Sequence, residues 1–135
     1  MKPSTSRRPA PLKVLCIEDD CSSLSLIERT VGAHDHVVLL VARDGVRGTE
    51  MAREHRPDLV LTALDVAGIG GEEVLARLRV DPCTRSVPVI VSGQAPATAE
   101  ERLIGRGAQC YLPKPIDAAE LARAIEDRAE VRDAA

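Results

Sequence analysis

Three adjacent carboxylates stand near the start of the chain, and their spacing suits metal chemistry. Glu18, Asp19 and Asp20 follow directly after an apolar run at residues 14–17. Carboxylates this close repel one another and raise one another's pKa unless a cation is near. A hard divalent ion, Mg²⁺ in the first place, would relieve the repulsion through oxygen ligands. Asp20 can equally cap the following helix while Glu18 and Asp19 face solvent, and the local sequence leaves both interpretations open.

A lysine between two prolines is the second candidate. Pro113 and Pro115 fix the backbone on either side of Lys114, and the Lys–Pro peptide bond of such a turn is a candidate for the cis form. A lone lysine is usually a solvated surface group. Lys114, however, follows one apolar run just as Ser92 follows another. An acid cluster, a hydroxyl and an ammonium group therefore all come at the ends of expected strands.

These strands are expected because five short apolar runs alternate with segments of helical spacing. Short runs of aliphatic, often β-branched residues are typical of strands buried on both faces of a parallel sheet. The alternation predicts right-handed βαβ units and a three-layer α/β fold, in which ligands gather at the carboxyl ends of the strands. The five runs are residues 14–17, 37–41, 59–61, 87–91 and 110–112.

The helices between the runs are predicted from apolar residues that recur on one helical face. Asp117 is placed to cap the last helix with its side chain. The helices expected between residues 41 and 59 and between residues 91 and 110 have weaker patterns. The clear apolar stripes are Leu24, Ile27 and Val31; Val74, Leu75 and Leu78; and Ala118, Leu121 and Ile125.

Length and composition indicate one domain of 135 residues. We expect a disordered basic, proline-rich tail at residues 1–11, the domain at residues 12–130 and a short C-terminal tail at residues 131–135. The formal net charge of -3 argues against nucleic acid as a direct partner. The longest apolar run is too short to cross a membrane, and no secretory signal follows Met1.

The four cysteines include no Cys-x-x-Cys pair, so we expect free thiols and a cytoplasmic protein. Tyr111 is the single aromatic residue, and the core must therefore be aliphatic. The segment His34-Asp35-His36 could suggest a metal site or a phosphohistidine. It falls in an expected helix–strand turn, however, where a solvated loop is the favoured interpretation.

Together these motifs resemble the receiver domain of response regulators in two-component signalling. The resemblance covers residues 12–129 and implies a doubly wound, flavodoxin-like fold: a five-stranded parallel sheet in the order 2-1-3-4-5 with helices on both faces. It implies a signalling module rather than an enzyme. The motifs that carry it are Ile17-Glu18-Asp19-Asp20, Pro57-Asp58-Leu59-Val60-Leu61, Gly68 and Gly71, Ser92, Gly107-Ala108, and Tyr111-x-x-Lys114-Pro115.

Roles for the site residues follow from this resemblance, position by position. Glu18 and Asp19 match the acidic pair that binds Mg²⁺ in the family, and Asp65 would offer its backbone carbonyl to the same metal. Ser92 matches the hydroxyl that senses the phosphate, and Lys114 matches the lysine that contacts it.

The phosphoacceptor position departs from the family pattern. The family places an aspartate six residues after the proline that precedes the third strand, and this chain has Ala63 six residues after Pro57. A methyl group cannot form an acyl phosphate, and loss of the carboxylate is expected to weaken Mg²⁺ binding. On a strand, Asp65 would share the face of Ala63 but lie about 6.6 Å further along, too far to substitute. Thr62 would face the other way.

Two hypotheses about Ala63 stay open. In the first, the chain is a stand-alone bacterial receiver of a phosphorelay that lacks its acceptor through an Asp→Ala substitution, and its partner is a histidine kinase or a phosphotransfer protein. In the second, it is a natural pseudo-receiver, a protein-interaction module that is independent of phosphorylation. The stand-alone expectation rests on the short sequence after Arg132.

Either hypothesis implies a protein partner at one face of the domain. By the resemblance, a downstream protein binds the fourth helix, the fifth strand and the fifth helix around Tyr111, which matches the family's aromatic switch position. A homodimer is also left open. A third class, an α/β hydrolase or phosphatase, is disfavoured because Ser92 has no histidine partner in the pattern.

Overall fold

The computed structural model describes residues 10–96 and 98–134, so residues 1–9 of the expected basic tail lie outside the described residues. Strands and helices alternate along this part of the chain, as predicted. The strands are β1 (Leu12–Ile17), β2 (Val37–Ala42), β3 (Leu59–Ala63), β4 (Val89–Gly93) and β5 (Cys110–Pro113). The helices are α1 (Cys21–Gly32), α2 (Gly45–His55), α3 (Gly71–Val80), α4 (Thr98–Gly105) and α5 (Ala118–Ala134).

Neighbouring strands pair in parallel in the order β2-β1-β3-β4-β5, which confirms the predicted doubly wound topology. The register sets Ala63, at the end of β3, opposite Ser92 in β4. Ser92 in turn lies opposite Leu112 in β5. The carboxyl ends of β1, β3, β4 and β5 therefore come to the same edge of the sheet, where ligands of such folds bind.

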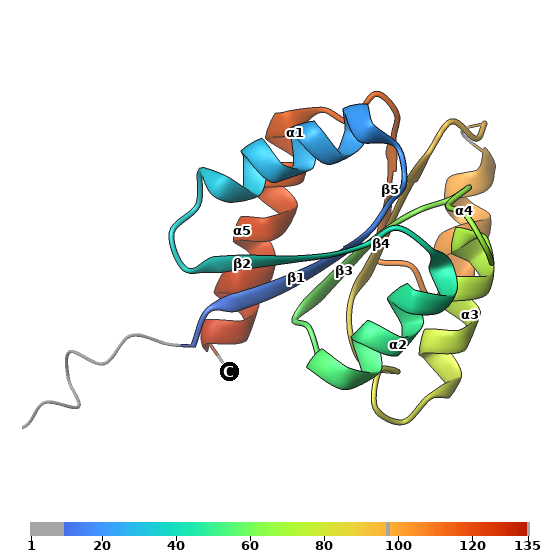
Figure 1. Cartoon of the computed structure of the whole chain (residues 1–135), viewed down its shortest axis with the longest axis horizontal. Coiled ribbons are helices and arrows are strands. Elements are labelled where there is room, and N and C mark those ends of the chain that lie inside the picture. The colour runs from blue at the N-terminus through green and yellow to red at the C-terminus, as the bar shows by residue number, and fades with distance from the viewer. Residues whose placement is uncertain (1–9, 97, 135) are drawn as a thin grey trace, which may run out of the picture.

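Helices cover both faces of this sheet, with α1 and α5 on one side and α2, α3 and α4 on the other (Figure 1). The interior is aliphatic apart from Tyr111, and the predicted stripes of α1 and α3 are buried in it. In α5, Leu121 and Ile125 are buried whereas Ala118 is exposed. Asp117 caps α5, since its carboxylate accepts the N–H of Ala119 at 2.8 Å.

The last turns of α5 reach Ala134, so the helix includes residues that we expected to form a tail from residue 131. The guanidinium of Arg132 donates to the carbonyl of Pro11 at 3.1 Å and lies 3.4 Å from the carboxylate of Asp58. Arg128 donates to the backbone carbonyl of Asp58 at 2.8 Å. These bonds fasten the helix end to the starts of β1 and β3.

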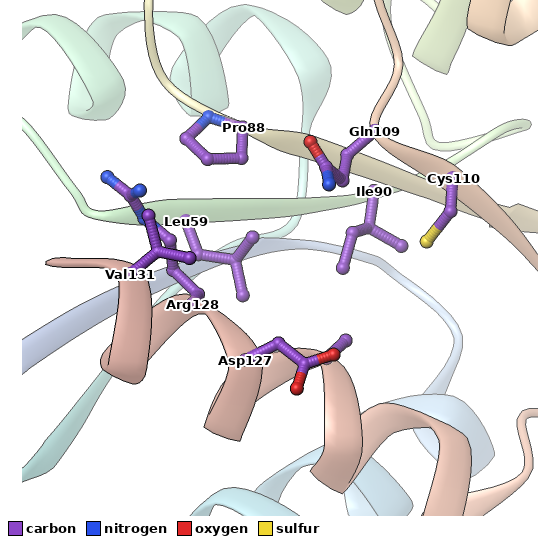
Figure 2. A pocket seen from close by; sticks show the side chains of 9 residues that line it. Leu59, Pro88, Ile90, Gln109, Cys110, Asp127, Arg128 and Val131 are labelled. Atoms are coloured by element: carbon purple, nitrogen blue, oxygen red, sulfur yellow. The ribbon is translucent and has the colours of Figure 1, made fainter. Parts of the chain in front are cut away.

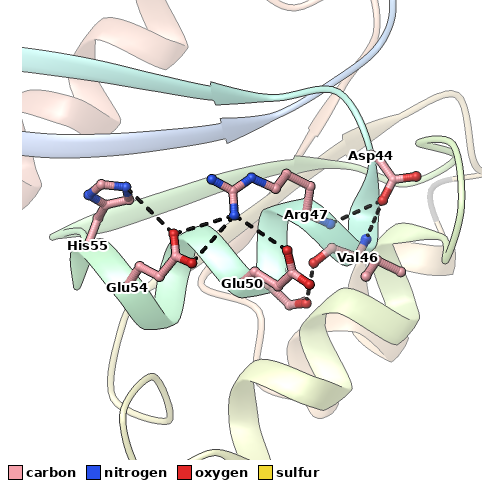
Figure 3. A network of polar contacts seen from close by, with 7 residues as sticks. Asp44, Val46, Arg47, Glu50, Glu54 and His55 are labelled. Atoms are coloured by element: carbon pink, nitrogen blue, oxygen red, sulfur yellow. Dashed lines mark hydrogen bonds and ion pairs between the residues drawn. The ribbon is translucent and has the colours of Figure 1, made fainter.

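The outer face of α2 carries a network of charged side chains (Figure 3). Asp44 caps the helix by accepting the N–H groups of Val46 and Arg47. The guanidinium of Arg47 lies 3.4 Å from carboxylate oxygens of both Glu50 and Glu54. These side chains are about half exposed, so the ion pairs add little to stability.

None of the helices in the described part of the chain has the length and apolar character needed to span a membrane.

The cysteines are free thiols, as predicted. Cys16 lies in β1 and is buried, whereas Cys21 is exposed at the start of α1. Burial, and after it the nearby carboxylate of Glu18, raise the pKa of the Cys16 thiol to about 12. Cys16 is therefore a small apolar core residue rather than a reactive group.

Gly71 starts α3 at its closest approach to β3. A Cβ atom at this position would lie 2.4 Å from the carbonyl oxygen of Ala63 and 2.9 Å from the Cα atom of Leu64. Both are backbone atoms, which cannot move aside without shifting the strand end. The N–H of Gly71 also donates to the carbonyl of Leu64 at 2.8 Å. Glycine is thus required for α3 to begin directly against the end of β3.

We predict that Gly71→Ala lowers the free energy of unfolding by about 2 kcal/mol, in the range of overpacked cores. Gly105→Ala is the matched control, because nothing lies within 4 Å of a Cβ atom there and alanine favours the helix by up to about 1 kcal/mol over glycine. Urea unfolding followed by far-UV circular dichroism measures both values. Equal stability of the two variants would contradict the close approach.

His34 links the end of α1 to α5. Its Nδ1 lies 2.8 Å from the carbonyl oxygen of Thr30, and its Nε2 lies 3.0 Å from the carboxylate of Glu126. Both ring nitrogens therefore face acceptors, which favours the doubly protonated imidazolium. The hydrogen bond to Glu126, followed by the bond to Thr30, raises the pKa of His34 above its usual value.

This raised pKa predicts a contribution to stability that depends on pH. The contribution is complete below the unfolded pKa of about 6.5 and is lost as the pH rises through the higher folded pKa, because the native state holds the proton more tightly. His34→Gln should therefore cost more free energy of unfolding near pH 5.5 than near pH 8.5. Urea titrations at both pH values test this. His55→Gln is the control, because it replaces an exposed histidine. An equal cost at the two pH values would refute the argument.

Candidate functional site

A cleft at the carboxyl ends of the strands brings together most of the predicted site residues. It has a volume of about 280 Å³. The residues that line it are Glu18, Asp19, Asp20, Asp65, Gln94 and Lys114. Each follows the end of a strand, so the parallel register is what gathers them from four separate parts of the chain.

Glu18 is the buried carboxylate of this cleft, with 2 % of the residue exposed. It comes directly after β1. Its Oε2 accepts the N–H groups of Asp19 and Asp20, each at 3.1 Å. Its Oε1 lies 2.8 Å from Nζ of Lys114. Two amide donors and the nearby charge of the ammonium group thus compensate the carboxylate, although Oε1 itself has no hydrogen-bond partner among the described residues.

Lys114 reaches Glu18 from the loop that follows β5. Its backbone N–H donates to the carbonyl of Gly93 at 2.8 Å, which holds the loop against the end of β4. Its peptide bond to Pro115 is cis, as the sequence suggested. The side chain is 12 % exposed, and Nζ also lies 4.0 Å from the carboxylate of Asp20. The expected approach of the lysine to the acidic cluster is thus present in the structure.

The other two carboxylates of the cluster are exposed and bind backbone groups. Asp19 accepts the N–H of Ala67 at 3.2 Å. Asp20 caps α1 by accepting the hydroxyl of Ser23 at 2.7 Å and its N–H at 3.2 Å. These bonds, the hydroxyl first, hold the pKa of Asp20 below its usual value. The carboxylates of the cluster therefore have different roles: Asp20 caps a helix, whereas Glu18 is a buried charge.

Ala63 and Ser92 are paired residues at the ends of β3 and β4, and each is 1 % exposed. The Ser92 hydroxyl has no hydrogen-bond partner among the described residues. The methyl group of Ala63 offers neither a donor nor an acceptor. At the position where the resemblance places a phosphoacceptor, the structure thus has a methyl group paired across the strands with an unsatisfied buried hydroxyl.

Asp65 and Gln94 complete the rim of the cleft. Asp65 is exposed in the turn after β3, not on the strand as the spacing argument assumed. Gln94 was not predicted from the sequence. It follows directly after β4, however, and residues at the ends of strands were the ones expected to form the site. Thr62 is fully buried, and its hydroxyl donates to the carbonyl of Ala63 at 3.1 Å, so it is not accessible for modification.

The oxygen-only donor set has the chemistry that Mg²⁺ prefers, and its carboxylates already have partners within the protein. No group of three acidic, histidine or cysteine side chains within residues 10–96 and 98–134 is arranged to hold a metal. Glu18 is engaged by two amides and by Lys114, and Asp19 by Ala67. A positive charge already stands at the buried end of the cleft.

Tyr111 ties β5 to the loop that precedes α4. Its ring is buried, with 7 % of the residue exposed, and its hydroxyl accepts the N–H of Ala95 at 2.8 Å. A Cβ atom at Gly93 would lie at an ordinary contact distance of 3.6 Å from this hydroxyl but only 2.8 Å from Cβ of Leu64, so glycine there makes room for Leu64. The residue at the expected switch position therefore points inward and holds the β4–α4 loop.

We predict that Tyr111→Phe lowers the free energy of unfolding by about 1 kcal/mol, because the N–H of Ala95 loses its partner. The measurements are urea unfolding and hydrogen exchange at the Ala95 amide, which should become faster. Amides of β1, on the far side of β3, are the internal control and should exchange as before. An unchanged Ala95 amide would show that the hydroxyl does not hold the loop.

A second hollow, of about 240 Å³, lies at the opposite edge of the sheet (Figure 2). It is formed by the amino ends of β3, β4 and β5 under the second half of α5. Leu59, Ile90 and Cys110 supply apolar lining, and Asp127 and Arg128 are its charged residues. Burial raises the pKa of the Cys110 thiol. This groove lacks the converging polar groups of the cleft at the other edge.

The segment His34-Asp35-His36 forms a turn, as the sequence indicated. His34 is engaged with Glu126 of α5. His36 has a left-handed backbone conformation with φ of 64°, and its carbonyl accepts the N–H of Leu12 at 2.7 Å. The histidines thus serve the helix–strand connection, and the described residues around them do not form a metal cluster.

Comparisons with known proteins bear on the same residues. The family model of the response regulator receiver domain matches residues 14–126. The polar-differentiation response regulator DivK of Brucella anthropi is 34% identical over 107 residues, which are 78% of this chain and 86% of that protein.

Two solved receiver domains are similar in structure. One belongs to a sensor histidine kinase of Pseudomonas aeruginosa PAO1 and carries a magnesium ion in its active site cleft; it is 25% identical, with a TM-score of 0.76, over 87% of this chain and 97% of that one. The receiver domain of the Francisella response regulator 1452 is 21% identical and shares the fold, with a TM-score of 0.80 over 89% of this chain and 98% of that one.

Proposed function

The chain belongs to the response regulator receiver domain family of two-component signalling, and we propose that it works there without accepting a phosphoryl group. In this role it is a protein-interaction module: partners bind its surface, and no phosphoryl group is transferred to its site.

One observation carries the proposal, namely the methyl group of Ala63 at the end of β3. Phosphoryl transfer to a receiver needs a carboxylate nucleophile at this place, and a methyl group cannot act as one. The carboxylate of Asp65 does not replace it, because Asp65 lies beyond the strand in an exposed turn.

The remaining site residues keep the family's chemistry in this proposal. Ser92 and Lys114 are the groups that would contact a phosphate, and Glu18, Asp19 and the backbone of Asp65 are those that would hold Mg²⁺. When bound in a receiver, the ion supplies positive charge beside the phosphoacceptor. With Ala63 in place of that carboxylate, one ligand is missing, so we propose weakened Mg²⁺ affinity.

The partners that we propose are a histidine kinase or phosphotransfer protein and a downstream protein. The face formed by α4, β5 and α5 is the binding surface for the downstream protein, since Tyr111 of β5 fixes the loop before α4. Ile104 of α4 is 46 % exposed on the surface and offers an apolar contact. Four free thiols agree with a cytoplasmic location.

A second candidate function is a phosphorylation-competent receiver from which only the nucleophile is missing. The unsatisfied hydroxyl of Ser92 favours it, because a buried polar group without a partner is uncommon unless it has a role. Glu18 and Lys114 are also in place at the same edge of the sheet.

We predict that the chain gains no phosphoryl group from acetyl phosphate and Mg²⁺, as measured by intact mass, because it has no nucleophile. Ala63→Asp is the informative variant, and Ala63→Asn is its control, because it has the same shape without a nucleophilic carboxylate. A phosphoryl group on Ala63→Asp alone would support the second candidate. None on any of the three chains would support a site devoted to interaction.

Labelling of the chain as it stands, at equal level in Ala63→Asn, would contradict both candidates. The acceptor would then be a residue other than 63, and peptide mapping would identify it.

A further inference from the structure

We propose that the outer edge of β2 binds a second copy of this chain, so that two β2 strands pair antiparallel across a two-fold axis and the two sheets become one. The inference goes beyond the proposed function and rests on neither hypothesis about Ala63. β2 is the strand at the opposite edge of the sheet from β5 (Figure 1), so the face formed by α4, β5 and α5 stays open in each copy.

The two edges of the sheet differ in their protection against such pairing. Natural edge strands are kept from pairing by shortness, by proline or lysine, or by bulges. β5 has four residues, ends in Pro113 and is followed by Lys114. β2 has six residues, all of them aliphatic, and it pairs with β1 in unbroken register. The outer edge of β2 therefore lacks the usual protection.

Every second residue of β2 turns its backbone groups away from the sheet. The carbonyl of His36 accepts the N–H of Leu12 at 2.7 Å. The carbonyl of Ala42 accepts the N–H of Glu18 at 2.9 Å. Because the backbone groups of a strand alternate in direction, the even-numbered residues bond to β1, and the odd-numbered ones face outward without a partner among the described residues. These outward residues are Val37, Leu39 and Val41.

A two-fold axis through Leu39 gives the register in which the outward groups of two copies meet. Leu39 then lies opposite Leu39 of the second copy, and Val37 lies opposite Val41. In antiparallel pairing, each such pair exchanges both of its backbone hydrogen bonds. Opposite residues also share a face of the sheet, because both are odd-numbered. The edge is therefore complementary to itself, as an isologous interface requires.

The same register brings opposite charges together at both ends of the paired strands. Arg43 follows β2 directly, Asp35 lies in the turn before it, and both are exposed. Neither side chain has an ion pair among the described residues. Arg43 of one copy faces Asp35 of the other, and the two-fold axis repeats this pair. Charge complementarity thus favours a second copy as the occupant.

The side chains that the pairing covers are apolar on both faces of the sheet. Val38 is 41 % exposed, and in this register it lies opposite Leu40 of the second copy. On the other face, Val37, Leu39 and Val41 are only partly buried. Cross-strand aliphatic pairs stabilise a sheet. Since two short strands form a small interface, we expect a reversible dimer with a Kd on the order of 100 µM.

The experiment exchanges the charges at the two ends of β2. Arg43→Asp and Asp35→Arg each place like charges opposite one another in the dimer, whereas the double variant restores opposite charges. Arg85→Asp is the matched control, because it makes the same charge change at an exposed arginine in the loop before β4. Sedimentation velocity up to about 1 mM chain measures Kd, and far-UV circular dichroism verifies that each variant is folded.

We expect Kd to rise about tenfold in each single variant, because two attractive pairs per dimer become repulsive. Kd of the double variant and of Arg85→Asp should stay close to that of the wild type. Equal Kd values in all five chains would place the dimer on another face and overturn the proposal. A wild-type chain that is monomeric at about 1 mM would overturn it as well.

Hydrogen exchange within β2 gives an independent signature of the same pairing. The outward amide of Leu39 should exchange more slowly as the chain concentration rises, whereas the amide of Leu40, which faces β1, should be protected at every concentration. Exchange at Leu39 that stays fast in the dimer would contradict the proposal. Slow exchange at Leu39 in a chain that remains monomeric would mean that another segment of the same chain covers the edge, and would refute it too.

Discussion

Parallel pairing in one register is the constraint on which the chemistry of this molecule depends. In a sheet with helices on both faces, the strands must be apolar along their length, because any polar side chain within them would be buried without water. Polar side chains within the inner strands are then few and lie near the strand ends, as Thr62 and Ser92 do. The register aligns the ends of β1, β3, β4 and β5, so residues as distant in the chain as Glu18 and Lys114 meet at a single edge.

The same constraint explains why so much could be predicted from the sequence. Strands of such a sheet stand out as short apolar runs, and all five were recognised to within a few residues, although β2 is only partly buried and not covered on both faces as expected. The strand order came from the resemblance to receiver domains rather than from the pattern itself. Ser92 and Lys114 were found as site candidates because each follows such a run. The aliphatic core followed from the lack of Trp and Phe.

What the sequence did not predict depends on contacts between distant residues. Nothing local distinguishes Glu18, which is buried, from Asp19 and Asp20, which are not; the path of the chain after β1 decides it. The extension of α5 to Ala134 depends on Arg132, whose partners lie at the starts of other elements. Amphipathic spacing reports one helix at a time, so such pairings have no sequence signal.

The position of Tyr111 has a practical consequence for anyone who studies this protein by optical methods. A chain without Trp or Phe has one side chain that contributes to its near-ultraviolet spectrum, and that side chain lies between β5 and the loop before α4. Tyrosine emission and near-ultraviolet dichroism therefore report the state of this one face, with no background from the rest of the core. Binding of a partner at this face would change these two signals, so it could be followed without any added label.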